Sequence, residues 1–269
     1  MLPVLTRREL RQHLRVAERA ARAVGPLLRR WAGRPLRVTT KRSPIDLVTE
    51  VDRRAERTIG RILQRAYPAH GFLGEETGTA TGRSGYHWCV DPIDGTSNFI
   101  HGVPMFCTSI ALVAGDQPLV GVIYHPIHDE LFTAVRDGGS LLNRQRLRVS
   151  RVRQLSGSLF GTGFPSEFRR APRQFLKPFQ AFQLTTHAVR RTGSAALNLA
   201  YVACGRFDGV WEANIWPWDV AAGVLLVREA GGRVTTFTGR RFHVRERNVL
   251  VTNGRIHRAA LATLRRARR

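Results

Sequence analysis

Cysteine is scarce in this chain, which has only Cys89, Cys107 and Cys204 among its 269 residues. Three such scattered cysteines are too few for a disulfide framework or a zinc site. Each lies in an apolar stretch, so we expect buried, reduced thiols. Apolar runs of about 18 residues or more are also absent, which argues against a membrane span, and the first residues do not resemble a signal peptide. These absences favour a soluble, cytoplasmic protein.

Lysine and acidic residues are scarce as well. The 43 basic residues face 20 acidic ones, which gives a formal net charge of +23, and only Lys41 and Lys177 among the basic residues are lysine. Such a charge permits binding to nucleic acid or to an acidic surface. However, an arginine-rich coding composition would produce the same excess, and the basic residues are spread along the chain, with local density in 144–153 and 255–269. Both interpretations stay open.

The composition is that of a globular protein, with 43% hydrophobic and 23% charged residues, and the length is ample for a substantial core. Internal repeats and flexible linkers are absent. We therefore expect a single unit over 1–269. Within it, an N-terminal half (1–150) with the metal-binding motifs and a C-terminal half (151–269) with the substrate motifs should pack together as layers.

Periodicity predicts helices and strands in both halves. Thr6 and Glu9 have the spacing of a capping box, and apolar residues then recur every three or four positions as far as Trp31. Short β-prone runs separated by turn signals predict an antiparallel meander in the middle of the chain. This mixture predicts an α+β fold. The expected helices after the first are 51–66, 166–182, 194–203, 219–230 and 256–268, and the expected strands are 108–113, 119–125, 130–136, 207–211, 234–237 and 248–251.

Carboxylates beside turn residues stand out in so basic a chain. An apolar strand leads to Asp91, and Asp94 follows in a turn that Gly95 permits. Two carboxylates so close repel each other unless a cation lies between them. Magnesium takes oxygen ligands, and the Ile93 carbonyl offers another, while the N–H groups near Gly95 and Thr96 suit a phosphate.

Three further acidic segments strengthen this interpretation. Glu75 lies in a paired acidic turn after an apolar run, Asp52 lies at the start of a helix, and Asp219 precedes an apolar helix. Each of them, taken alone, is explained equally well by a turn or a helix cap. Their combination with the Asp91–Asp94 turn favours a metal site.

These motifs resemble those of the inositol monophosphatase family, in order and spacing, over nearly the whole chain. The likeness is greatest to the bacterial inositol-1-monophosphatase type within the lithium-sensitive phosphatase superfamily. The matching segments are Lys41–Asp52, Gly74–Glu76, Asp91-Pro-Ile-Asp-Gly-Thr96 with Asn98-Phe99, Gly193–Asn198, Trp211-Glu212, and Trp218–Gly223 with Glu229-Ala-Gly-Gly232.

The resemblance implies a Mg²⁺-dependent phosphomonoesterase with two or three ions in the active site. It assigns Glu75, Asp91 and the Ile93 carbonyl to the first ion. It assigns Asp91, Asp94 and Asp219 to the second, and a third, weaker ion would lie near Glu75. Hydrolysis by a water activated by such ions needs no catalytic histidine.

Roles around the water and the substrate are implied in the same way. Asp52 and Thr96 match the pair that orients and deprotonates the nucleophilic water, with Glu75 as a further catalytic residue. Lys41 matches a lysine of the family's mobile active-site loop. The implied substrate-binding residues are Asp94, Gly95, Thr96, Gly193, Ser194, Ala195, Glu212 and Asp219.

The family resemblance also implies a layered α/β/α/β/α architecture and a homodimer. The substrate it implies is inositol 1-phosphate or a similar small polyol phosphate. Histidinol phosphate, 3′-phosphoadenosine 5′-phosphate and fructose 1,6-bisphosphate remain alternatives, since Trp216 is bulkier than the family pattern and small pocket changes shift discrimination by only ~1–3 kcal/mol. A hypothesis of another class is an RNA- or transcription-associated accessory factor. Some bacterial members of the family act in ribosomal RNA antitermination, and the basic charge suits that role.

Overall fold

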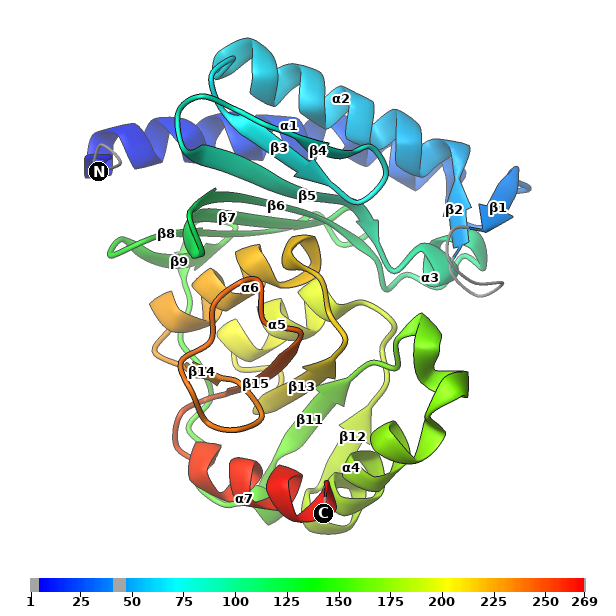
Figure 1. Ribbon diagram of the computed structural model, residues 1–269, viewed down its shortest axis with the longest axis vertical. Coiled ribbons are helices and arrows are strands. Elements are labelled where there is room, and N and C mark those ends of the chain that lie inside the picture. Colours follow the sequence, from blue (N-terminus) through cyan, green and yellow to red (C-terminus); the bar gives the residue numbers. More distant parts are fainter. Residues whose placement is uncertain (1–4, 41–46, 269) are drawn as a thin grey trace.

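The computed structural model describes residues 5–40 and 47–268. Its elements form five layers, which follow one another from top to bottom in Figure 1. A helix pair covers an eight-stranded sheet, a second helix pair separates this sheet from a five-stranded one, and a third helix pair covers the far side. The α+β class and the α/β/α/β/α layering are therefore confirmed.

The first layer consists of α1 (Arg7–Trp31) and α2 (Glu50–Ala66). Both begin with a capping box, which satisfies N–H groups that a helix start leaves without partners. Thr6 and Glu9 form the box of α1, as expected, and Thr49 and Asp52 form that of α2. Each helix buries one apolar face against the other helix and the sheet beneath.

The eight-stranded sheet has the order β10-β9-β8-β7-β6-β5-β3-β4. Its pairs are antiparallel except β3 with β5, and β6, β7 and β8 form the expected meander. A short β1–β2 ribbon (Val38–Thr40 and Leu47–Thr49) precedes α2, and α3 (Thr96–Ile100) follows β5. The strands are β3 (Gly71–Gly74), β4 (Gly78–Ala80), β5 (Tyr86–Asp94), β6 (Cys107–Ala114), β7 (Gln117–His125), β8 (Glu130–Val135), β9 (Gly139–Leu142) and β10 (Gln145–Arg146).

The middle helices α5 (Ala195–Ala203) and α6 (Pro217–Glu229) are apolar on nearly all sides, because a sheet covers them from above and below. They touch closely at Gly223, where an added Cβ would lie 2.5 Å from Leu199 Cβ. Close packing of this kind fixes where the first residues of both helices lie.

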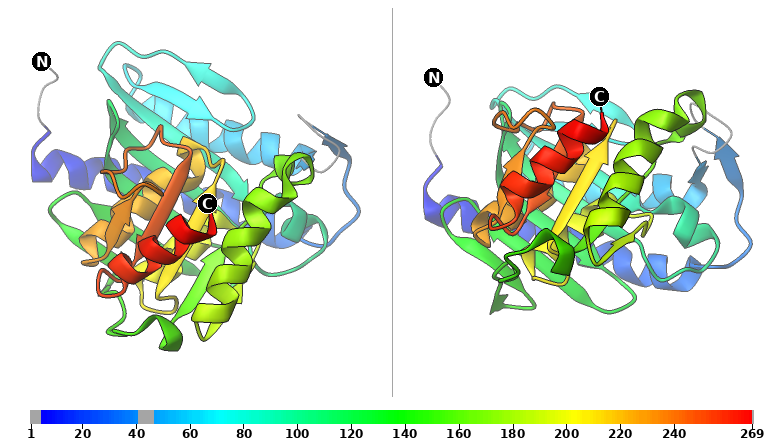
Figure 2. Two further views of the ribbon diagram at one scale, coloured as in Figure 1. Left: turned by 60° about the horizontal axis from the view of Figure 1, so that its bottom comes forward. Right: turned by 90° about the horizontal axis from the view of Figure 1, so that it is seen from below.

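The five-stranded sheet has the order β12-β11-β13-β15-β14, and α4 (Pro172–Thr185) and α7 (His257–Ala267) lie on its outer face, as Figure 2 shows. Two short 3₁₀ helices cover 155–157 and 166–170. The strands are β11 (Leu159–Thr162), β12 (Ala188–Arg190), β13 (Gly209–Ala213), β14 (Arg233–Thr235) and β15 (Asn248–Thr252).

Some expected boundaries were wrong. A single helix over 166–182 is replaced by a 3₁₀ turn and α4, because Pro172 can begin a helix but its ring excludes a helical residue before it. Ala171 accordingly has φ −144° and ψ 62°. The strand expected over 207–211 begins two residues later, at Gly209, and the strand expected over 234–237 already ends at Thr235.

The cysteines match the expected free thiols, with Cys89 and Cys107 buried and Cys204 half-buried. Among the described helices, none is long and apolar enough to cross a membrane. All strands of the first sheet precede residue 150 and all strands of the second follow it, but α5 and α6 pack against both sheets. The division into halves 1–150 and 151–269 stays a prediction.

Candidate active site

Strand β5 delivers the first two carboxylates of the site. Its pairing with β6 slips between Asp91 and Asp94, which is a bulge, so that Asp94 pairs with Cys107. Gly95 then turns the chain into α3 with φ 100°, a conformation that favours glycine, and an added Cβ would lie 2.8 Å from the Met105 carbonyl oxygen. The bulge and the glycine together re-aim two aspartates that an unbroken strand would hold differently.

Asp91 lies at the centre of a group of acids. Its side chain is 2% exposed and accepts the Ile93 N–H at 2.9 Å, and it shares a hydrogen bond with Glu75. Burial, followed by the negative charges of Glu75, Asp94 and Asp219, raises the pKa of Asp91 well above its ordinary value. The structure thus brings together the four carboxylates that the sequence predicts as metal ligands.

Asp94 is directed at the first turn of α5. Its Oδ2 accepts the Ser194 hydroxyl and the Ala196 N–H, both at 2.6 Å, and its Oδ1 accepts the Ala195 N–H at 3.3 Å. Burial raises the pKa of Asp94 to about 6, although the bonds from Ser194 and Ala196 act in the opposite direction. The predicted substrate residues Ser194 and Ala195 therefore contact a predicted metal ligand.

Asp219 occupies the equivalent place at the start of α6. Its Oδ2 accepts the Trp216 N–H at 2.9 Å, which is half of a capping box. Burial raises the pKa of Asp219 well above its ordinary value, and the charges of Glu75 and Asp94 raise it further.

Glu75 lies in a turn that α2 holds in place. The Glu56 carboxylate accepts the N–H groups of Glu76 at 2.9 Å and Thr77 at 2.7 Å. Gly74 leaves room for it, since an added Cβ would lie 2.5 Å from Glu56 Oε2. Sequence reasoning missed Glu56. A buried acid within the apolar stripe of α2, one turn after Asp52, is the signal that could have found it.

Thr96, Asp52 and the Ile93 carbonyl form one network, and the catalytic role of Thr96 and Asp52 stays a prediction. The Thr96 hydroxyl lies 3.1 Å from Asp52 Oδ1 and 3.0 Å from the Ile93 carbonyl oxygen. The other oxygen of Asp52 accepts the Thr49 N–H at 2.8 Å and the Thr49 hydroxyl at 2.5 Å. Asp52 is therefore a capping residue of α2 and a partner of Thr96 at the same time.

Glu212, on β13, is a buried acid beside this group. Its carboxylate is 5% exposed and accepts the Gly163 N–H at 2.8 Å and the Asn198 side-chain N–H at 3.1 Å. Burial raises the pKa of Glu212 to about 8, against the effect of these two bonds, and the charge of Asp94 adds to the rise. Gly163 was missed, because nothing in its sequence neighbourhood marks it.

Gly193 lies just before α5, where its lack of a side chain leaves room for Asn98. It has φ 88°, and an added Cβ would lie 2.8 Å from the side-chain nitrogen of Asn98. That nitrogen donates to the carbonyl oxygens of Met105 at 2.7 Å and Thr192 at 2.8 Å. Asn98 thus ties the segment after α3 to the segment before α5. Lys41 lies outside the described residues, so its predicted place near the site is not addressed.

The donor chemistry of the site fits a hard divalent cation. Carboxylate and carbonyl oxygens are the ligands Mg²⁺ prefers, whereas burial raises the pKa of the nearby Cys107 thiol, which stays protonated and unsuited to a metal. Carboxylates held this close repel one another, as the effect of Glu75, Asp94 and Asp219 on the pKa of Asp91 indicates, and a cation between them would relieve that repulsion. Within the described residues, no three His, Cys, Asp or Glu side chains are already arranged around one ion, because Asp94 and Asp219 are turned to N–H groups.

Comparisons with known proteins agree with this geometry. Residues 9–269 match the model of the inositol monophosphatase family. Nus factor SuhB of Pseudomonas aeruginosa is 43% identical over 257 residues, covering 93% of this chain and 95% of that protein. Inositol-1-monophosphatase of Mesorhizobium japonicum is 43% identical over 256 residues, covering 94% and 96%. The solved inositol monophosphatase from an Anabaena species superposes with a TM-score of 0.88 at 40% identity, covering 96% of this chain and 97% of that one.

Proposed function

Because the chain belongs to the inositol monophosphatase family, whose phosphatases are generally metal-dependent, we propose that it is a Mg²⁺-dependent phosphomonoesterase. Its substrate is inositol 1-phosphate or a similar small polyol phosphate. The observation that carries the proposal is the convergence of Glu75, Asp91, Asp94 and Asp219 from three separate segments, close enough for the neighbouring charges to raise the pKa of Asp91 and Asp219.

The family resemblance implies two Mg²⁺ ions in this site, or three with a weaker ion near Glu75. Glu75, Asp91 and the Ile93 carbonyl would hold one ion, and Asp91, Asp94 and Asp219 would hold the other. Bound ions supply Lewis-acid activation of water and compensation for the phosphate charge.

The chain's own residues handle the proton and orient the phosphate. A water hydrogen-bonded to Thr96 would pass a proton through that hydroxyl to Asp52, whose Oδ1 is 3.1 Å away. Thr49 holds the second oxygen of Asp52, Oδ2, so Oδ1 stays directed at Thr96. The N–H groups of Gly95 and Thr96 would hold the phosphate, as the family resemblance implies.

Polyol hydroxyls would be held on the side of the site formed by α5 and β13. Glu212 and Asp94 are buried acceptors there, and Ser194 and Ala195 lie at the N-terminus of α5. Gly193, which precedes that N-terminus, adopts a positive φ and adds no side chain to this part of the site. A site built to bond hydroxyl groups discriminates against an analogue that lacks them, because the bonds that those hydroxyls would make are lost.

The test is phosphate release by wild type and Asp94→Asn with Mg²⁺ or with EDTA. The panel is inositol 1-phosphate, histidinol phosphate, 3′-phosphoadenosine 5′-phosphate and fructose 1,6-bisphosphate, with lithium as inhibitor in one arm. Mg²⁺-dependent release that the mutation abolishes supports the phosphatase, and the preferred compound names the substrate. If a folded protein releases phosphate from none of them, the substrate assignment is wrong.

A second candidate function is a role beside the transcription machinery. It is favoured by the Pseudomonas relative, which is named a Nus factor, together with the formal charge of +23. Such a role would use contacts outside the metal centre, so it should survive Asp94→Asn. The test is to measure binding of the chain to RNA and to RNA polymerase. Sedimentation of the same protein establishes whether it is the expected homodimer. Loss of binding in Asp94→Asn would contradict a separate surface.

A further inference from the structure

Exposed arginines are concentrated on the two helices of the outermost layer. These helices, of 25 and 17 residues, carry thirteen arginines, all of them exposed, out of 43 basic residues in the whole chain. We refer to them together as the arginine face. Its members are Arg7, Arg8, Arg11, Arg15, Arg19, Arg22, Arg29, Arg30, Arg53, Arg54, Arg57, Arg61 and Arg65.

Acidic residues do not balance this charge. Of the five acids on α1 and α2, only Glu9 and Glu50 are exposed. Asp52 and Glu56 are buried in the site described above, and Glu18 is half-buried. A coding preference explains why the basic residues are arginine rather than lysine. It does not explain why three of the five acids of these helices are buried or half-buried while all thirteen arginines are exposed.

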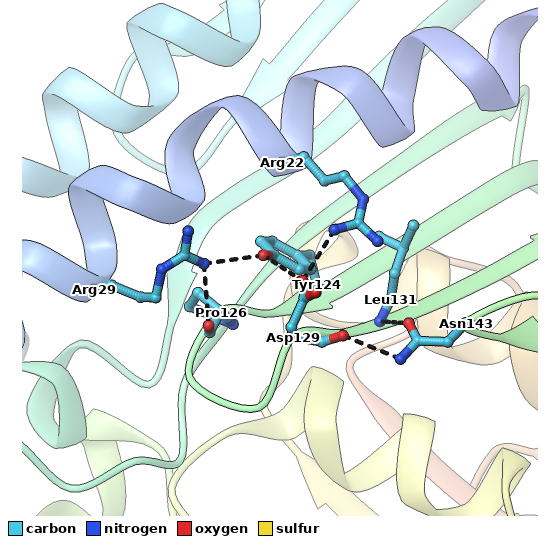
Figure 3. Close-up of polar contacts among 7 residues, drawn as sticks. All are labelled: Arg22, Arg29, Tyr124, Pro126, Asp129, Leu131 and Asn143. Atoms are coloured by element: carbon cyan, nitrogen blue, oxygen red, sulfur yellow. Dashed lines mark hydrogen bonds and ion pairs between the residues drawn. The ribbon is translucent and has the colours of Figure 1, made fainter.

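Two arginines of the face also contact the turn between β7 and β8. Figure 3 shows Arg22 in an ion pair with Asp129, and Arg29 donating to the Tyr124 hydroxyl and the Pro126 carbonyl. The distances are 2.9 Å for the ion pair and 3.1 and 3.2 Å for the two bonds of Arg29. These contacts fasten α1 to the turn between β7 and β8. Within the described part of the chain, Arg22 is the one member of the face with a recorded ion pair to a carboxylate.

The shape of the face suits an extended partner. Figures 1 and 2 show α1 and α2 side by side on the outer side of the first sheet, with no other layer over them. At about 1.5 Å per residue, α1 is roughly 37 Å long. Arg11, Arg15 and Arg19 lie one turn apart on α1, as do Arg57, Arg61 and Arg65 on α2. The face therefore carries two adjacent rows of positive charge.

We propose that the arginine face binds the phosphate backbone of nucleic acid, without reading its sequence. Guanidinium groups match phosphate oxygens in pairs, and a row of charges along a rod fits a linear polyanion better than a compact one. An anionic membrane fits less well. Peripheral membrane helices also insert apolar side chains, and the large hydrophobic residues that are exposed, among those described, lie outside α1 and α2. The proposal does not depend on phosphatase activity, and it gives the second candidate function a surface.

The test compares two sets of four substitutions in the full-length chain. One variant removes four charges from the two rows, Arg11, Arg15, Arg57 and Arg61, each changed to Gln. None of these residues belongs to the metal, catalytic or substrate group. A milder variant, Arg15→Gln with Arg61→Gln, serves if the first does not fold.

The matched control removes four charges from exposed arginines at the opposite side of the molecule, on the layer of α4 and α7 and on the turn that precedes α4. It carries Arg169→Gln, Arg170→Gln, Arg173→Gln and Arg258→Gln, all exposed positions on the 166–170 turn, α4 or α7. A third protein with the first four arginines changed to Lys keeps the charge and tests whether charge or guanidinium geometry matters.

Binding is measured by fluorescence anisotropy with labelled single-stranded RNA, duplex RNA and duplex DNA, each about 20 nucleotides or base pairs long, over roughly 0.05–0.3 M salt. We expect the Gln variant to bind at least tenfold more weakly than wild type at ~0.1 M salt. On duplex DNA its slope of log K against log salt should be smaller by up to about 3–4, since each phosphate contact contributes about 0.9. The control should lose less than about threefold. The three probes identify which nucleic acid is preferred.

Several results would overturn the proposal. Equal losses in the variant and in the control would mean that net charge alone is responsible. Tighter binding to phosphatidylserine vesicles than to any nucleic acid, lost in the same variant, would assign the face to a membrane. Phosphate release is measured on every protein. If wild type releases no phosphate but the Gln variant still loses RNA binding, the phosphatase proposal fails and the nucleic-acid proposal stands. If wild type releases phosphate but binds no nucleic acid, the phosphatase proposal stands and the nucleic-acid proposal fails.

Discussion

Glu56 provides a direct test of how the Glu75 turn is held. Glu56→Ala removes the acceptor of two N–H groups, those of Glu76 at 2.9 Å and Thr77 at 2.7 Å. A hydrogen bond to a charged group is worth ~1.5–3 kcal/mol. The turn is partly exposed, so water recovers some of the loss, and we expect the free energy of unfolding to fall by about 3 kcal/mol in total. Glu56→Gln keeps one acceptor oxygen but turns an NH₂ group towards the other donor, and should lose about half as much.

The same substitution should weaken metal binding without removing a ligand. Glu75 follows Gly74, whose lack of a side chain lets the Glu56 carboxylate approach. Loss of a partner that orients a ligand typically costs ~10–100-fold in metal affinity. We therefore expect Glu56→Ala to need at least about tenfold more Mg²⁺ for half-maximal phosphate release, with kcat at saturating Mg²⁺ changed much less.

Urea unfolding and Mg²⁺ titrations of activity measure the two effects. Glu50→Ala, an exposed acid at the start of the same helix, is the control and should cost under about 1 kcal/mol. If Glu56→Ala unfolds at the same urea concentration as wild type and shows the same Mg²⁺ dependence, Glu56 does not position the turn.

Three further predictions concern other parts of the molecule. Burial lowers the pKa of His125 and His257 to about 4, so the unfolded chain takes up these protons first, and the stability that these histidines contribute should be constant above about pH 6.5 and fall towards pH 4 by on the order of 2 kcal/mol per histidine after allowance for screening. Urea unfolding of wild type and of His→Gln variants at several pH values isolates this contribution from that of the buried acids, and a difference between them that does not change with pH would contradict it. Arg247→Met removes a guanidinium 3.7 Å from the centre of the Trp216 ring, and should cost about 1–2 kcal/mol in thermal unfolding, with Arg247→Lys losing less. Gly95→Ala places a Cβ 2.8 Å from a carbonyl oxygen at φ 100°, and should cost at least about 2 kcal/mol; a variant with wild-type stability would contradict the strain.

The fold was predictable from the sequence where an element is long enough to show a local pattern. α1 spans 25 residues with one buried stripe, so its periodicity identified it. β6 and β7 are eight and nine residues long, and they were identified as β-prone runs between turn signals. β12 has three residues and β11 has four, one of them Gly161, which is too little for any pattern. Their pairing depends on strands far away in the chain, which no local signal contains.

The site residues likewise differ in whether the local sequence marks them. Asp91 and Asp94 were found because the turn that holds them is local, and its proline and glycine are visible in the sequence. Glu56 bonds an N–H twenty residues away, and Gly163 bonds Glu212 across 49 residues. In both cases a backbone N–H is the donor, and every residue except proline carries one, so the sequence does not indicate which one is used.

The charge balance of the site predicts how many ions it takes. Two helices begin beside ligand acids, α5 beside Asp94 and α6 at Asp219, and each helix start contributes about +0.5 of an elementary charge. Against four carboxylates of the predicted ligand set this leaves roughly −3, and the bonds that Asp94 and Asp219 accept come from a hydroxyl and N–H groups rather than from arginine. About one to two divalent ions balance the site alone, whereas a phosphate dianion raises the deficit to roughly −5 and calls for about two to three. Calorimetric titration with Mg²⁺ should therefore give a stoichiometry that rises by about one when inorganic phosphate is present, and Asp94→Asn should bind fewer ions than wild type. Equal stoichiometry under both conditions would show that the acids, and not the phosphate, determine how many ions are bound.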